Sequence, residues 1–170
     1  TRETANPAGS EALFDLAKAA EQRRDMNQAI GLYRELTLKT AEVNDPWAAK
    51  AVDRLTALLT PWIEAAIASQ DDLTVVSLFH RHGAVARKRY ARSPLLLQIA
   101  DAHRRLGFAA EGSSLYQQVI KMHNDPALIE PALIGLGKIY LDQRDPDAAR
   151  KVFERYRFQF PLGAYEGEVV

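Results

Sequence analysis

The chain has 170 residues, of which 26% are charged and 47% are hydrophobic, and its formal net charge is zero. A chain of this length can bury roughly 70% of its unfolded surface, which is enough for one domain with its own core. The absence of cysteine excludes disulfides and thiolate metal sites, and no apolar run approaches the ~18 residues of a membrane helix. Since the first residue is Thr1 rather than methionine, we expect a fragment or a processed form.

Two helices are predicted near the start of the chain, after a tail over residues 1–9. Ser10 suits the N-cap position, and a first apolar stripe extends to about Arg24. Asp25 and Asn27 interrupt it, a second stripe runs toward Val43, and residues 44–46 form a turn. The first stripe contains Leu13, Leu16, Ala17 and Ala20, and the second contains Ala29, Ile30, Tyr33, Leu36 and Leu38.

Residues 47–92 are predicted to form a less regular pair of helices. A helical stripe begins at Trp47 and reaches Pro61, which either kinks one long helix or begins a second one, because proline lacks a backbone donor. Trp62 follows and is expected in the core. Residues 69–72 form a polar turn, and the partner helix is loosened at Gly83. The apolar side chains of that partner helix are Leu73, Val76, Phe79 and Val85.

Two further helix pairs complete the chain. Ser93 and Pro94 begin the third pair, whose turn lies at Leu106 and Gly107. In the fourth pair, Asp145 caps the second helix and Pro161 ends it. Residues 163–170 are expected to be a tail or the beginning of another helix that is cut short. The fourth pair carries its apolar positions at Leu133, Leu136, Gly137, Tyr140, Ala149, Phe153 and Tyr156.

The four helix pairs share an internal pattern. If a small or apolar residue of the first helix is position i, another small or apolar residue lies at i+12 and an aromatic ring lies at i+16. The four sets are Ala17, Ala29 and Tyr33; Ile63, Val75 and Phe79; Ala100, Gly112 and Tyr116; and Gly137, Ala149 and Phe153. The first members, which we call the anchors, follow one another at intervals of 46, 37 and 37 positions.

This pattern resembles the tetratricopeptide repeat family, whose period is about 34 residues. The resemblance covers residues 10–162 and includes Leu-x-x-Leu-Gly-x-x-Tyr from Leu133 to Tyr140. It implies an all-α, right-handed α-solenoid of about four tetratricopeptide-like hairpins, the second irregular, in a single domain over residues 10–162.

Catalytic and metal-binding patterns are not found. His80 and His82 are two residues apart on a predicted helix, so they point in nearly opposite directions and are not expected to chelate a metal. No His-Glu-x-x-His motif, phosphate-binding glycine loop or Gly-x-Ser-x-Gly motif is present. We therefore expect no enzyme activity, no catalytic residue, no metal and no cofactor.

Basic residues outnumber acidic ones between residues 76 and 110, although the whole chain is neutral. The favoured interpretation of this basic band, residues 81–105, is a solvated helix face, and the alternatives are a site for an anion or acidic peptide or for nucleic acid. A sequence pI near 6.9 disfavours nucleic acid. The band contains Arg81, Arg87, Lys88, Arg89, Arg92, Arg104 and Arg105.

The remaining candidate is the concave groove that first helices line in stacked hairpins. The resemblance implies a non-catalytic scaffold that binds a protein or peptide in this groove, or alternatively a regulatory module of a larger enzyme. The sequence does not decide whether the chain forms a homo-oligomer. The ending Phe-Gln-Phe-Pro at residues 158–161 also resembles repeat lipoproteins of bacterial envelope assembly machines, which favours a periplasmic or cell-envelope setting. The implied groove residues are Phe14, Lys18 and Glu21 in unit one, Leu97, Asp101 and Arg104 in unit three, and Ile134, Lys138 and Leu141 in unit four.

Overall fold

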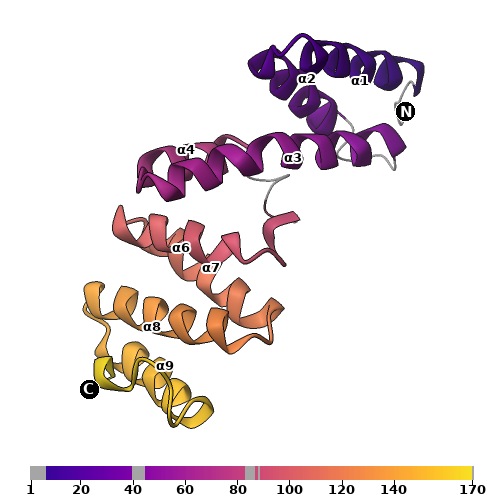
Figure 1. Cartoon of the computed structure of the whole chain (residues 1–170). Coiled ribbons are helices and arrows are strands. Elements are labelled where there is room, and N and C mark those ends of the chain that lie inside the picture. Colours follow the sequence, from indigo (N-terminus) through magenta and orange to yellow (C-terminus); the bar gives the residue numbers. More distant parts are fainter. Residues whose placement is uncertain (1–6, 40–44, 83–86, 88, 170) are drawn as a thin grey trace.

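A computed structural model describes residues 7–39, 45–82, 87 and 89–169, and within these ranges the chain is helical without strands. Four helical hairpins are stacked in chain order from one end of the molecule to the other, so the all-α solenoid expected from the sequence is confirmed (Figure 1). The hairpins are α1 (Pro7–Gln22) with α2 (Met26–Lys39), α3 (Pro46–Ala68) with α4 (Asp72–Arg81), α6 (Leu95–Arg105) with α7 (Ala109–Met122), and α8 (Pro126–Asp142) with α9 (Pro146–Gln159).

The interior of each hairpin contains the residues that the internal pattern selected. All four anchors are buried, as are the small or apolar residues at i+12. The aromatic rings at i+16 are buried as well, and those of Phe79 and Tyr116 reach the next unit, where they contact His103 and Gly135. At Gly137 the fit is closest, because a Cβ atom there would lie 2.2 Å from Cε1 of Phe153. The register assigned to all four units is therefore confirmed.

The turn between the two helices is the same in every hairpin. The seventh residue after each anchor has a positive φ, which is 63° at Arg24, 58° at Gln70, 80° at Gly107 and 59° at Arg144. The next residue donates its backbone N–H to a carbonyl five positions earlier, as in the bond from Asp25 to Ala20. Of the four residues only the glycine indicates this left-handed conformation in the sequence, so the conformation of the other three turns was not predicted.

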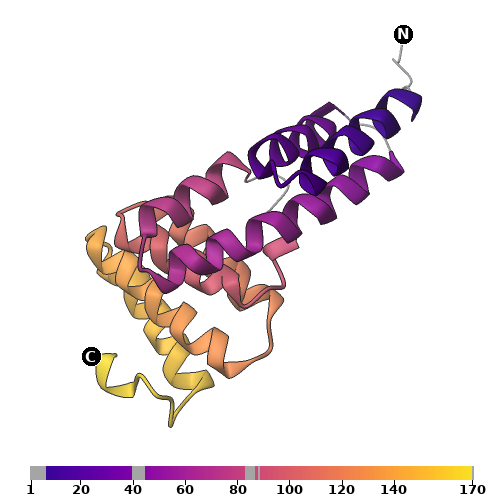
Figure 2. The same ribbon diagram turned by 45° about the horizontal axis from the view of Figure 1, so that its top comes forward.

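The second unit differs through the length of α3, which has 23 residues. It continues through Pro61 as one helix, so proline does not begin a new one. Its first half lies against unit one, where Trp47 contacts Phe14 with a ring separation of 5.2 Å, and its second half pairs with α4 (Figure 2). The additional residues between the first two anchors thus lie in α3, which packs against both unit one and α4.

Several local expectations need correction. The first helix begins at Pro7, so Ser10 lies within α1 and is buried rather than capping it. Trp62 is 41% exposed and Leu16, Leu38 and Leu73 are exposed, so these side chains are not in the core. After Pro161 a short 3-10 helix, η1 (Glu166–Glu168), forms instead of another α-helix. Residues 1–6, Val43, Gly83, Val85 and Lys88 lie outside the described residues.

None of the helices between residues 7 and 169 that the structure describes is both long and apolar enough to cross a membrane.

Candidate binding groove

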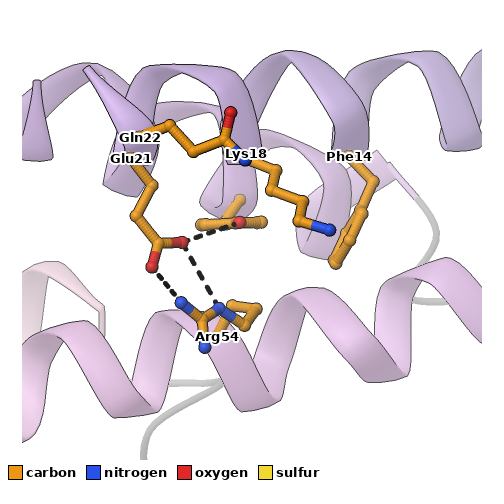
Figure 3. A pocket seen from close by; sticks show the side chains of 6 residues that line it. Phe14, Lys18, Glu21, Gln22 and Arg54 are labelled. Carbon is orange, nitrogen blue, oxygen red and sulfur yellow. Dashed lines mark hydrogen bonds and ion pairs between the residues drawn. The ribbon is translucent and has the colours of Figure 1, made fainter. Parts of the chain in front are cut away.

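A hollow of about 390 Å³ lies between the first helices of units one and two. Phe14, Lys18, Glu21 and Gln22 reach it from α1, and Arg54 reaches it from α3 on the opposite side (Figure 3). The hydroxyl end of Tyr33, from α2, lines it as well. The structure therefore brings together the three residues expected from unit one, in a hollow built by three helices.

The acidic group of this hollow is already neutralised. Arg54 forms an ion pair with Glu21 and donates from Nε to Oε2 over 3.3 Å. The hydroxyl of Tyr33 donates to the same carboxylate over 3.1 Å, and burial together with the Glu21 charge raises the pKa of Tyr33. Because Glu21 is satisfied by these two partners, it holds the hollow in shape rather than offering a free negative charge.

Lys18 is different, because its side chain is exposed and its ammonium group has no carboxylate partner in the described part of the chain. This side chain extends toward the ring of Phe14 (Figure 3). Phe14 packs against Tyr33 and Trp47 at ring separations of 5.4 and 5.2 Å, which fixes its position. Phe14 is therefore largely a core residue, only 9% exposed, and the hollow presents one uncompensated positive charge beside the small accessible part of its ring.

In unit three the expected residues form a network of their own. The hydroxyl of Tyr116 donates to Asp101, and Arg104 donates from Nε to that hydroxyl over 3.3 Å. Burial, reinforced by the Asp101 charge, raises the pKa of Tyr116. Asp101 also lines a second hollow, of about 410 Å³, while Leu97 is half-buried against the core.

In unit four the three expected residues are in different environments. Ile134 is only 4% exposed, and Lys138 forms an ion pair of 2.6 Å with Glu168. Leu141 is 51% exposed. The chain's own residues after Pro161 cover the first two, so the register alone did not reveal which groove positions are accessible.

The basic band is partly compensated by acidic neighbours. Arg105 forms an ion pair with Asp72 in which Nε and Nη2 donate over 2.7 and 2.6 Å, and this pair links α6 to α4. Arg89 forms an ion pair with Asp53, and Arg87 lies 6.0 Å from the centre of the Phe79 ring. This arrangement favours the interpretation of a solvated helix face over a dedicated anion site.

No set of three metal-ligating side chains converges within the ranges that the structure describes. His80 lies beside His103, with a ring separation of 5.3 Å, while His82 is buried elsewhere. Burial lowers the pKa of both His82 and His103. These histidines contribute to packing in the described structure.

Three lining residues of the first hollow were missed in the sequence: Gln22, Tyr33 and Arg54. The hydroxyl of Tyr33 was an available signal, since the aromatic member of each set faces the first helix of its hairpin. Arg54 could not be placed, because its position depends on how the long helix α3 lies against α1.

Comparison with known proteins supports the repeat assignment. Models of the tetratricopeptide repeat match residues 11–39 and 97–164, and no curated protein matches the chain. One similar solved structure is a variant of putative kinesin light chain nearly identical TPR-like repeats from Podosopora anserina. It has 15% identity and a TM-score of 0.39, and the alignment covers 94% of this chain and 78% of the other.

A second similar structure is BtubC (BKLC) from P. vanneervenii, with 16% identity and a TM-score of 0.36. Its alignment covers 96% of this chain and 68% of the other. At these identities and TM-scores neither structure transfers an arrangement of units or a partner to this chain.

Proposed function

Since the chain belongs to the tetratricopeptide repeat family, whose repeats serve as protein-interaction scaffolds, we propose that it binds a partner protein through its first-helix groove without catalysing a reaction. The binding site is the hollow between α1 and α3. The partner inserts a segment that carries an acidic side chain next to an apolar one.

The observation that supports this proposal is that Lys18 and Phe14 line the same hollow next to each other. Lys18 has no acidic partner among the described residues, whereas Glu21 in the same hollow is held by Arg54 and Tyr33. A carboxylate of the partner would pair with the Lys18 ammonium group, and an apolar side chain would enter the hollow against the small part of the Phe14 ring that is accessible, 9% of its surface. Apolar anchors supply most of the affinity of such a contact, and the charge guides approach and register.

The experiment is affinity capture from a cell extract with the full chain as bait, followed by measurement of the dissociation constant of the captured protein. Lys18→Glu reverses the free charge of the hollow and should weaken binding of the partner about fivefold to tenfold. Arg92→Glu is a matched control, because it reverses one exposed charge in the basic band. If Arg92→Glu loses the partner while Lys18→Glu retains it, the basic band is the binding surface and the proposal is wrong.

A bacterial cell-envelope setting and a role as a module of a larger enzyme are further proposals. The first rests on the sequence of residues 158–161, in which Phe158 is strongly exposed. Fractionation of the source cells tests it, and sequencing of the flanking gene tests the second.

A further inference from the structure

Residues 163–169, which we call the return segment, fold back onto the last hairpin. The chain turns after α9, and η1 lies beside α8 and α9 rather than extending away from them (Figures 1 and 2). The return segment therefore occupies a face of unit four that includes two of the expected groove residues, Ile134 and Lys138.

The first half of the return segment is held through its main chain. The backbone N–H of Ala164 donates to Oε2 of Glu130 over 3.0 Å, and that of Tyr165 donates to the hydroxyl of Tyr156 over 2.9 Å. A Cβ atom at Gly163 would lie 2.2 Å from the same hydroxyl oxygen, so only glycine allows this approach without a shift. Because these bonds are made to the main chain, they hold the segment independently of the side chains of Ala164 and Tyr165.

The second half is held through a charge and an apolar side chain. Lys138 binds Glu168 at 2.6 Å, and Arg157 donates to the carbonyl of Val169. The side chain of Val169 is 2% exposed and belongs to the same apolar cluster as Ile134. An acidic residue followed directly by a branched aliphatic residue thus fills this part of the face.

Unit one has a large apolar residue and a lysine at the same register as unit four. Ile134 and Lys138 lie three positions before and one position after the anchor Gly137, and Phe14 and Lys18 lie three before and one after the anchor Ala17. In unit one the pair borders the open hollow, whereas in unit four it is covered by the chain itself.

We propose that the return segment is an internal occupant of a second partner site on unit four. The site takes a segment folded as a turn and a 3-10 helix, in which a carboxylate immediately precedes a branched aliphatic side chain, and such a partner must displace residues 163–169. On this face Lys138 pairs with Glu168 of the segment, while Arg157 and Glu130 bind its main chain. This inference rests on the proposed function, since it assigns a second site to the same groove.

The test uses the full chain and a dye-labelled peptide, Gly-Ala-Tyr-Glu-Gly-Glu-Val, which copies residues 163–169. Glu168→Lys breaks the ion pair, and Gly163→Val drives a side chain into Tyr156, so each variant releases the return segment by a different route. A short tethered segment acts at a millimolar effective concentration, which weakens a competitor with a dissociation constant of about 0.1 mM by about tenfold. We expect both variants to bind the peptide about tenfold more tightly than the unmodified chain.

Amide exchange shows whether the segment is docked. In the unmodified chain the amides of Ala164 and Tyr165 should be protected, and both variants should lose this protection. The double variant Lys138→Glu with Glu168→Lys restores an ion pair of reversed polarity, so it should regain protection and bind the peptide poorly. Circular dichroism checks that the helices are intact, and Gly163→Val serves alone if Glu168→Lys is unfolded.

The inference is overturned if the amides of Ala164 and Tyr165 exchange freely in the unmodified chain. It is also overturned if the Glu168→Lys and Gly163→Val variants bind the peptide no more tightly than the unmodified chain. Peptide binding is measured in the Lys18→Glu background, because the hollow of unit one is proposed to take the same pairing of an acidic with an apolar side chain. Weaker binding of the captured partner by Lys18→Glu and failure of peptide binding on unit four are therefore separate results.

Discussion

Replacement of Gly137 by leucine tests the packing register of the hairpins. A Cβ atom at this position would lie 2.2, 2.5 and 2.9 Å from three atoms of the Phe153 ring, which is buried. The ring must rotate or α9 must move, and overpacking of this kind costs about 1–3 kcal/mol, although the higher helix propensity of leucine returns nearly 1 kcal/mol. Because the leucine side chain extends well beyond its Cβ atom, we expect an overpacking cost near the upper end of this range, about 3 kcal/mol, and hence a net loss of about 2 kcal/mol.

The control is Gly31→Ala in α2, where an added Cβ atom meets nothing within 4 Å. This variant should gain about 0.5–1 kcal/mol, because alanine favours a helix and nothing obstructs it. Urea unfolding followed by circular dichroism measures the midpoints of both variants. Thermal unfolding is a second measurement, in which the melting temperature should shift by roughly 2–4 °C for each kcal/mol. An unchanged or raised midpoint for Gly137→Leu, with the expected gain for Gly31→Ala, would refute the assigned contact between α8 and α9.

Two further predictions concern the turns and the buried histidines. Gly107→Ala should lose about 1 kcal/mol and Arg144→Gly should be neutral or stabilising, because both positions have a positive φ that side chains with a Cβ disfavour; urea midpoints of the two variants measure this difference. Burial lowers the pKa of His82 and His103, so the unfolded chain binds protons more readily and stability should fall as the pH drops below about 6.5. Between pH 7.5 and 5.5 each histidine contributes up to about 1.4 kcal/mol to this loss. The urea midpoint should therefore change less with pH in the His82→Gln and His103→Gln variants than in the unmodified chain, and an equal change would contradict the prediction.

The fold could be predicted because its signals are local. The spacing from Gly137 to Ala149 and Phe153 describes one hairpin, and its recurrence in the other units describes the stack. The left-handed turns at Arg24, Gln70 and Arg144 escaped prediction, because these side chains have no intrinsic preference for a positive φ and the packed helices impose it.

The candidate site could be predicted only where one helix supplies it. Phe14, Lys18 and Glu21 follow from the register of α1 alone, and they line one hollow. The contribution of Arg54 depends on the path of α3, and the covering of Ile134 depends on a segment without helical periodicity. Such contacts between distant parts of the chain have no signature in the local sequence.

Calorimetric titration of the captured partner into the full chain and its Lys18→Glu and Arg92→Glu variants tests the central claim most directly. If the partner's carboxylate binds Lys18, reversal of this charge should weaken binding about fivefold to tenfold, because an exposed ion pair contributes up to about 1 kcal/mol and reversal replaces attraction by repulsion. The weakening should be larger at low salt than at high salt, because salt screens exposed charges. Arg92→Glu should bind within about twofold of the unmodified chain, since a lone surface charge changes binding little. Equal affinity of Lys18→Glu and the unmodified chain, with the helices of both intact, would contradict a partner site in the hollow between α1 and α3.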